Sequence, residues 1–219
     1  MRDMAEAELA RFIDRYTAEY VRNYAHPIDC VWHAITDPAK FGDWFMPGDI
    51  ELRAGGEFRF AAGHWTGVVL AIDPPRLIRL RSAHDENGYF QYELTEVPGG
   101  ARMRFVQAFS PGVEYPGFNP DTPGSGTPWP GAVSGWHEFW DALGDHLDGL
   151  PVGSSLPQSR FGAIAASWAE KAHEFNYVLT PDQLDRILRG LRRKERWHEL
   201  NAIYADHMRA SLPPPGKSR

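Results

Sequence analysis

Two histidines and one tyrosine are the residues of this chain best suited to acid–base chemistry. His64 and His84 lie in turns near the ends of predicted strands, and Tyr92 lies on a predicted strand rich in aromatic residues. A histidine at the mouth of a cavity can exchange a proton near neutral pH, although a histidine in a turn is more often simply exposed. We keep these three residues as candidate catalytic residues without assigning a reaction, and expect Asp85 and Glu86 to belong to a solvated loop.

A near match to a zinc motif begins at His137, where His-Glu-x-x-Asp stands in place of His-Glu-x-x-His. His137 and Asp141 are one helical turn apart, as two metal ligands on one helix must be. Both are expected on the helix face opposite Trp136 and Trp140, pointing to solvent, and the spacing supplies no third ligand. We therefore predict no metal site and no cofactor.

Aromatic residues make up 13% of the chain and include 8 tryptophans, which indicates either a heavy core or an aromatic-lined cavity. Gln107 is the one polar residue in an alternating run with Met103, Phe105 and Phe109. A buried amide needs partners, so Gln107 either bonds within the protein or contacts a polar group of a ligand. The predicted ligand-binding residues are Trp44, Phe58, Phe60, Trp65, Tyr92, Phe105, Gln107, Trp136 and Trp140.

The elements that must position these residues are short strands followed by helices. Alternating residues bounded by turns predict strands over 16–24, 49–52, 56–61, 67–72, 77–82, 89–97 and 102–109. Apolar residues at helical spacing predict short helices over 28–37 and 38–45 and a long amphipathic helix over 131–150. Strands that follow one another without intervening helices indicate an antiparallel meander, and hence an α+β fold.

Two segments lie outside this pattern. Residues 110–130 are rich in proline and glycine, and are either a lid over a cavity or a surface loop. Residues 151–219 are predicted to be a helical extension of two or three helices with disordered last residues. Its first apolar stripe contains Phe161, Ile164, Trp168 and Phe175.

The next helix of the extension has a clear start signal, a capping box formed by Thr180-Pro181-Asp182-Gln183. A change of phase in its apolar residues predicts a bend or break within 190–196. A basic cluster on this helix is expected to be a solvated face, with docking onto an acidic partner as the alternative. The cluster consists of Arg189, Arg192, Arg193, Lys194 and Arg196.

Charge and composition exclude several classes of protein. Lys+Arg 23 and Asp+Glu 29 give a net charge of −6, which argues against a nucleic-acid binder. No run approaches 18 apolar residues, so no membrane span is expected, and the charged N-terminal stretch does not resemble a signal peptide. Cys30 is the single cysteine; it is expected to be a small buried residue rather than a nucleophile. Because no internal disulfide can form, we expect a cytoplasmic protein.

Several segments, taken in order, are similar to one superfamily. The run from Ala25 to Pro38, AHPIDCVWHAITDP, resembles the opening of the START-like (SRPBCC) helix-grip superfamily. Trp44-Phe45 followed by LRAGGEFR over 52–59 resembles the branch named after the activator of Hsp90 ATPase. Gly67-Val68-Val69, DPPRL over 73–77, GGARM over 99–103 and Gly135-Trp136 then follow in the expected order. The resemblance covers about residues 11–150.

This resemblance implies a curved antiparallel sheet wrapped around the long helix, with a cavity between them. It implies a START-like domain over 1–150 and leaves 151–219 as an extension, which either packs outside the grip or supplies a homodimer contact. The leading hypothesis is binding of a hydrophobic, aromatic or polyketide-like small molecule. The alternatives are a cofactor-independent cyclase, dehydratase or lyase acting in the same cavity, and a co-chaperone-like protein-interaction module.

Overall fold

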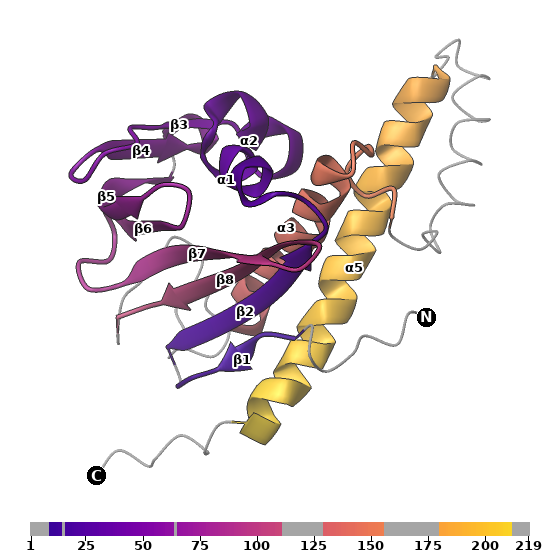
Figure 1. Cartoon of the computed structure of the whole chain (residues 1–219). Coiled ribbons are helices and arrows are strands. Elements are labelled where there is room, and N and C mark those ends of the chain that lie inside the picture. Colours follow the sequence, from indigo (N-terminus) through magenta and orange to yellow (C-terminus); the bar gives the residue numbers. More distant parts are fainter. Residues whose placement is uncertain (1–8, 15, 64, 111–128, 156–179, 212–219) are drawn as a thin grey trace.

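The computed structural model describes residues 9–14, 16–63, 65–110, 129–155 and 180–211 (Figure 1). Several predictions lie outside these ranges: the candidate His64, most of the predicted lid at 110–130, the first apolar stripe of the extension and the last residues of the chain.

The sheet has eight antiparallel strands, and most of its neighbours in space are neighbours in sequence. The strands are β1 (Arg11–Phe12), β2 (Thr17–Tyr24), β3 (Gly48–Ile50), β4 (Glu57–Phe60), β5 (Trp65–Asp73), β6 (Leu77–Ser82), β7 (Tyr89–Val97) and β8 (Gly100–Ala108). Their order is β1-β2-β8-β7-β6-β5-β4-β3, so β3 to β8 form the predicted meander and β2 pairs with its last strand. The two-residue edge strand β1 was not predicted from the sequence.

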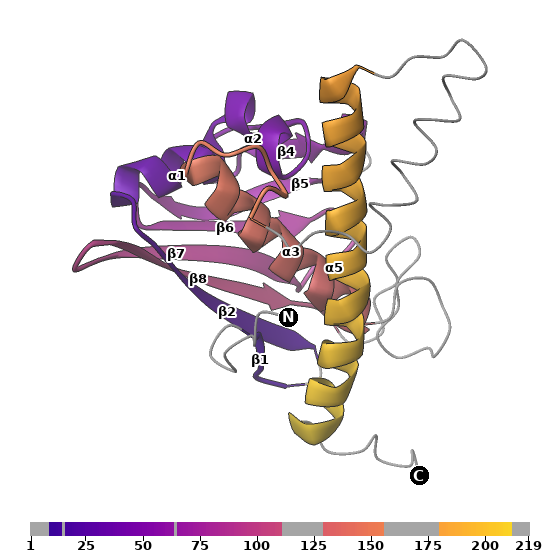
Figure 2. The same cartoon turned by 90° about the vertical axis from the view of Figure 1, so that its right-hand side faces the viewer.

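Helices α1 (Ile28–Thr36), α2 (Pro38–Trp44) and α3 (Trp129–Leu147) cover one face of the sheet (Figure 2). The break between α1 and α2 is set by Asp37 and Pro38. The Asp37 side chain accepts a hydrogen bond from the Ala39 backbone N–H at 3.0 Å, and Pro38 takes the first helical position, where its missing N–H is harmless. A turn of 3-10 helix, η2 (Ala61–Gly63), follows β4.

The inward face of the sheet follows the predicted alternation of apolar residues. The buried positions are Phe58 and Phe60 on β4, Phe90, Tyr92 and Leu94 on β7, and Met103, Phe105 and Gln107 on β8. This face packs against α3, whose Trp136, Trp140 and Leu143 are also buried. The core therefore lies between the sheet and α3, as the helix-grip arrangement requires.

Helix α5 (Pro181–Ser211) packs along the outer side of α3 (Figure 2). Its capping box is confirmed: the Thr180 N–H donates to Gln183 Oε1 at 2.8 Å, and the Gln183 N–H donates to Thr180 Oγ1 at 3.2 Å. The predicted bend or break within 190–196 is wrong, because α5 is one continuous helix.

The apolar residues of α5 do not need a common stripe, because its two halves have different surroundings. Leu200 and Tyr204 are fully buried in the second half, whereas Ile187 in the first half is 43% exposed. A single glycine, Gly190, costs about 1 kcal/mol in a helix, too little to end one rich in good helix formers. Within the described ranges, no helix combines the length and apolar character that crossing a bilayer requires.

Candidate functional site

The predicted aromatic residues meet in one connected cluster between the sheet and α3. Phe105 on β8 lies near its centre: its ring centroid is 4.5 Å from that of Trp136, 4.7 Å from that of Trp140 and 4.9 Å from that of Tyr92. Trp65 links this group to β4, since it contacts Trp136 as well as Phe58 and Phe60. Trp44 joins it through Trp140 at 6.1 Å.

Residues that sequence reasoning did not select complete the cluster. The ring of Phe45 stacks on that of Trp136, with centroids 5.7 Å apart, and meets that of Phe139 edge-on at 4.6 Å. Phe90 lies 5.0 Å from Trp65. The only sequence signal for Phe45 was its position beside Trp44, and its contacts depend on the backbone leaving the helix at that residue.

Two polar atoms inside this cluster have no hydrogen-bond partner among the described residues. They are Oε1 of Gln107 and Nε1 of Trp140. Gln107 is 3% exposed and Trp140 is 1% exposed. By contrast, the indole N–H of Trp44 donates to the Ala34 carbonyl at 2.9 Å. Because buried polar groups in proteins are nearly always paired, we expect a polar partner for the Gln107 and Trp140 groups.

Tyr92 supplies a third polar group to the cluster. Burial raises the pKa of its hydroxyl well above the ordinary value. The phenol is therefore protonated at neutral pH. Tyr20, on the same side of the sheet, uses its hydroxyl to donate to the Val133 carbonyl at 2.6 Å, which fixes the beginning of α3 against β2.

His84 and Asp85 have different surroundings from those the sequence indicates. His84 is exposed in the turn between β6 and β7, outside the aromatic cluster. The prediction of a solvated loop is wrong for Asp85, which is 1% exposed. Its carboxylate accepts hydrogen bonds from the backbone N–H groups of Gly88 at 2.7 Å and Ser110 at 2.9 Å, so it ties this turn to the end of β8.

Cys30 is exposed, so the prediction that it is buried is wrong. The face of α1 that packs into the core carries Ile28, Val31 and Ile35, and Cys30 lies off that face. Cys30 is close to these apolar residues in the sequence, but the helix turns its side chain away from the core.

The prediction that His137 and Asp141 point to solvent is also wrong, because α5 covers this face of α3. His137 is 1% exposed, and its Nδ1 atom lies 2.8 Å from the Tyr204 hydroxyl. Its Nε2 atom lies 3.9 Å from Asp141 Oδ1, and Asp141 lies 3.6 Å from Arg196. Burial, together with the positive charges of Arg22 and Arg196, lowers the pKa of His137 to about 2.

Burial shifts the pKa of Asp141 upward, the opposite direction to that of His137. Burial raises its pKa to about 6, against the lowering effect of Arg196 and Arg22. Within the described residues, no three histidine, cysteine, aspartate or glutamate side chains gather in a way that could hold a metal ion. The His137–Asp141 pair takes part in the packing of α5 on α3.

The basic cluster of α5 is only partly a solvated face. Arg193 forms a bidentate ion pair with Glu138, in which Nη2 and Oε2 are 3.1 Å apart. Arg196 faces Asp141. Lys194 is exposed, as predicted for the whole cluster. These arginines differ from the prediction for the same reason as His137 does: charged residues on facing sides of α3 and α5 meet only when the two helices pack.

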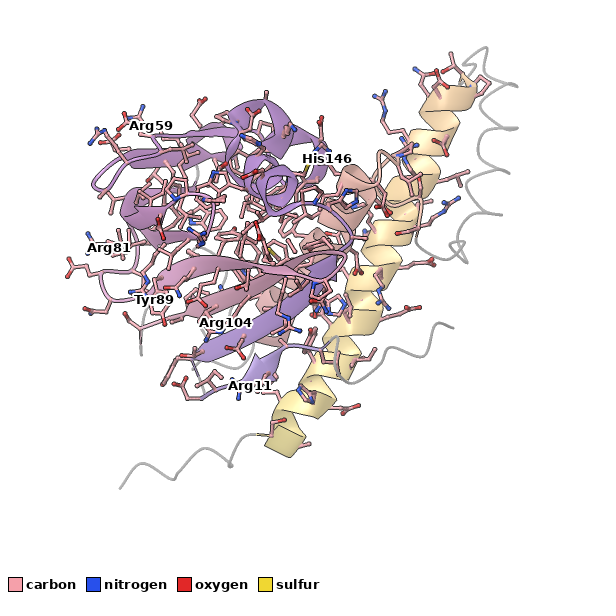
Figure 3. All side chains as sticks on the ribbon, viewed as in Figure 1. Arg11, Arg59, Arg81, Tyr89, Arg104 and His146 are labelled. Atoms are coloured by element: carbon pink, nitrogen blue, oxygen red, sulfur yellow. The ribbon has the colours of Figure 1, made fainter. Side chains whose placement is uncertain are left out.

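Apart from Arg22 on the inward side of β2, the sheet carries charged residues on its outer face, among them Arg59, Arg81 and Arg104 (Figure 3). Arg104 bridges Glu19 at 2.5 Å and Glu93 at 3.0 Å across three strands. Burial acts to raise the pKa of Glu19, but the hydrogen bonds from Arg11 and Arg104 outweigh it, so the pKa is lowered. The sheet therefore separates a charged outer face from an aromatic inner one.

The fold and the aromatic interior define the chain as a helix-grip α+β protein of the START-like class. The family model described as Activator of Hsp90 ATPase homolog 1-like protein matches residues 25–148, more than half of the chain. The protein belongs to this family. No curated protein matches the chain.

Solved structures share the fold over different lengths. The solution structure of CalU16 from Micromonospora echinospora is 20% identical, with a TM-score of 0.53, and the match covers 90% of this chain and 92% of that one. EF2215 from Enterococcus faecalis, a conserved protein of unknown function, is 13% identical with a TM-score of 0.57, covering 93% and 91%. MLL2253 from Mesorhizobium loti is 26% identical with a TM-score of 0.50, covering 61% of this chain and 97% of that one.

Proposed function

We propose that this protein binds a hydrophobic, aromatic small molecule between the inward face of the sheet and α3. The family and fold support this as the class of function, and the aromatic cluster around Phe105 supports the proposed location. The observation that carries it is Gln107, an amide whose carbonyl oxygen is buried among aromatic rings without a partner in the described chain.

The physical argument rests on the cost of an unmade hydrogen bond. A buried polar group without a partner costs about 1–3 kcal/mol, whereas an apolar side chain of similar shape would avoid that cost. A hydrogen-bond donor on a bound ligand would therefore explain why an amide occupies this position. The surrounding rings supply the apolar contact surface that small-molecule sites generally have.

The other predicted functions receive less support. A cyclase, dehydratase or lyase needs a proton-transfer group beside its substrate. Among the described residues whose rings contact Phe105, the titratable ones are Tyr20 and Tyr92, both with a raised pKa. For a protein-interaction module we find no comparable feature in the described residues, so binding remains the proposal.

Three further predictions accompany the proposal. A domain boundary at residue 150 stays a prediction, although the family match ends close by, at residue 148. The extension packs outside the grip through α5, and a homodimer contact remains the second role proposed for it. We also place the binding activity in the cytoplasm, because a single cysteine allows no internal disulfide.

The test is native mass spectrometry of the protein purified from its host without denaturation. We expect a mass above that of the chain that disappears on denaturation, and a smaller bound fraction in Gln107→Met. The matched control is Gln91→Met, the same substitution on the outer face of the neighbouring strand, where Gln91 bonds Arg79 and Glu93. A wild-type protein that retains nothing and binds no aromatic probe in solution would refute the proposal.

A further inference from the structure

Three polar side chains lie around the ring of Phe105, and two of them, Gln107 and Trp140, have a buried polar atom without a partner in the described chain. Gln107 follows Phe105 by two residues on β8, so the two side chains lie on the same face, about 7 Å apart along the strand. The rings of Trp140 and Tyr92 lie 4.7 Å and 4.9 Å from that of Phe105. These three polar side chains are therefore the ones that we expect a molecule bound against Phe105 to meet.

The three groups differ in what they can bond. The Trp140 indole N–H is a donor only, the Gln107 carbonyl oxygen is an acceptor, and the Tyr92 hydroxyl can act as either. A partner that satisfies the first two must offer both an acceptor and a donor. A hydrocarbon ligand would leave both groups unpaired, at the same cost as in the empty protein.

None of the described side chains whose rings contact that of Phe105 carries a charge. The rings that contact it belong to Tyr20, Tyr92, Trp136 and Trp140, and burial keeps both tyrosines protonated. Arg22 lies on the inward side of β2, two residues from Tyr20, and its charge acts on Tyr20 as well as on His137 and Asp141. A carboxylate or phosphate placed beside Phe105 would lose its hydration among uncharged rings, with Arg22 acting on it only from beyond Tyr20.

We propose that the ligand is an uncharged, planar aromatic compound whose acceptor takes the Trp140 N–H and whose donor faces the Gln107 carbonyl. This inference rests on the proposed function and adds the polar chemistry of the ligand to it. Gln107 and Trp140 then act as specificity-determining residues. The aromatic rings supply affinity for any flat apolar molecule, and the two polar groups select among such molecules.

The experiment compares four naphthalene probes that differ in their polar groups. They are naphthalene itself, 2-acetylnaphthalene as acceptor only, 6-acetyl-2-naphthol as acceptor and donor, and 2-naphthoate as the charged form. Dissociation constants are measured by calorimetry, with quenching of tryptophan fluorescence as a second readout. We expect 6-acetyl-2-naphthol to bind at least about tenfold more tightly than naphthalene, and 2-naphthoate to bind most weakly.

The variants assign the two polar groups separately. Gln107→Met should remove about tenfold of the preference for 6-acetyl-2-naphthol over 2-acetylnaphthalene while leaving naphthalene binding within about twofold. Trp140→Phe should remove the preference for 2-acetylnaphthalene over naphthalene. Gln91→Met, on the outer face of the sheet, should preserve both preferences.

The outcomes separate this inference from the proposed function. If the wild-type protein binds the uncharged probes but Gln107→Met keeps the full preference, the proposed function stands and this inference is wrong. Tightest binding of 2-naphthoate would overturn it as well, because the site would then hold a charge. If no probe binds and no ligand is retained from the host, both proposals fail together.

Discussion

The Nδ1 atom of His137 lies 2.8 Å from the hydroxyl oxygen of Tyr204, where α5 packs on α3. The same hydroxyl accepts a hydrogen bond from the Ala10 backbone N–H at 2.9 Å. Because a tyrosine hydroxyl can accept one hydrogen bond and donate another, we assign the Tyr204 O–H as the donor to Nδ1 of His137. This assignment leaves the proton of the neutral imidazole on Nε2, which faces Asp141. One side chain thus joins α5, α3 and the N-terminal segment.

Tyr204→Phe should lower the free energy of unfolding by about 2 kcal/mol, because it leaves the Ala10 N–H and His137 Nδ1 buried without a partner. Chemical denaturation at neutral pH measures the change. Tyr89→Phe is the matched control: the Arg79 guanidinium lies over the Tyr89 ring, 4.8 Å from its centroid, and that contact survives loss of the hydroxyl. Equal effects of the two substitutions would contradict the role assigned to Tyr204.

The His137–Asp141 pair should make stability nearly independent of pH between about pH 4 and 6. Folding lowers the pKa of His137 from 6.5 to about 2 and raises that of Asp141 from 3.8 to about 6. In this window the unfolded pair holds one proton on the histidine, and the folded pair holds one on the aspartate. Because the folded and unfolded pairs bind the same number of protons, the pair does not change the free energy of unfolding with pH in this window.

Single substitutions should reveal opposite slopes of up to about 1.4 kcal/mol per pH unit. In Asp141→Asn, the lowered pKa of His137 acts alone, so stability falls as the pH drops from 6.5 toward 4. In His137→Asn, the raised pKa of Asp141 acts alone, so stability falls as the pH rises from 3.8 through 6. Urea denaturation across this range measures both. Parallel profiles for the wild type and both variants would refute the coupling.

Gln107→Met should stabilise the ligand-free protein by about 1 kcal/mol, because it replaces an unpaired buried amide with an apolar side chain of similar length. Gln91→Met should instead destabilise the protein by about 1 kcal/mol, since Gln91 is 4% exposed and bridges Arg79 and Glu93. Thermal and urea unfolding of ligand-stripped protein give the comparison. Destabilisation by both substitutions would show that Gln107 has a structural partner.

Gly67→Ala should destabilise the protein by about 3 kcal/mol or prevent folding. A Cβ at Gly67 would overlap the Arg81 carbonyl oxygen and the ring of Phe58, and neither the paired strand nor the buried ring can move aside. Gly190→Ala, in the exposed middle of α5 with open space around it, should stabilise by up to about 1 kcal/mol. Soluble yield and unfolding curves test both, and a Gly67→Ala protein as stable as the wild type would be inconsistent with this packing.

Local patterns were sufficient to predict most of the fold. The alternation that places Phe90, Tyr92 and Leu94 on one face, the Asp37-Pro38 boundary and the Thr180–Gln183 capping box each depend on residues a few positions apart. Such interactions are written directly in the chain. Most of the predicted ring cluster follows as well, because a period of two fixes which side chains share the inward face.

The candidate site could be predicted only in part. Gln107 was selected as the one polar residue of an inward run, but the sequence could not show whether its amide is paired. Phe45 was missed, because its ring reaches Trp136 only after the backbone turns out of α2. Contacts of this kind depend on where a third element lies, and no local period records that.

The sequence by itself determined the strands, the helix-grip order and the inward aromatic face, because hydrophobic periodicity and capping act within a few residues. Only the tertiary structure decided that His137 is buried and Asp141 half-buried, that Arg193 pairs with Glu138 and that α5 is unbroken. The reason is that α3 has two packed faces. Its aromatic face meets the sheet, and its polar face is covered by a helix that begins 34 residues after α3 ends, at Pro181 after Leu147.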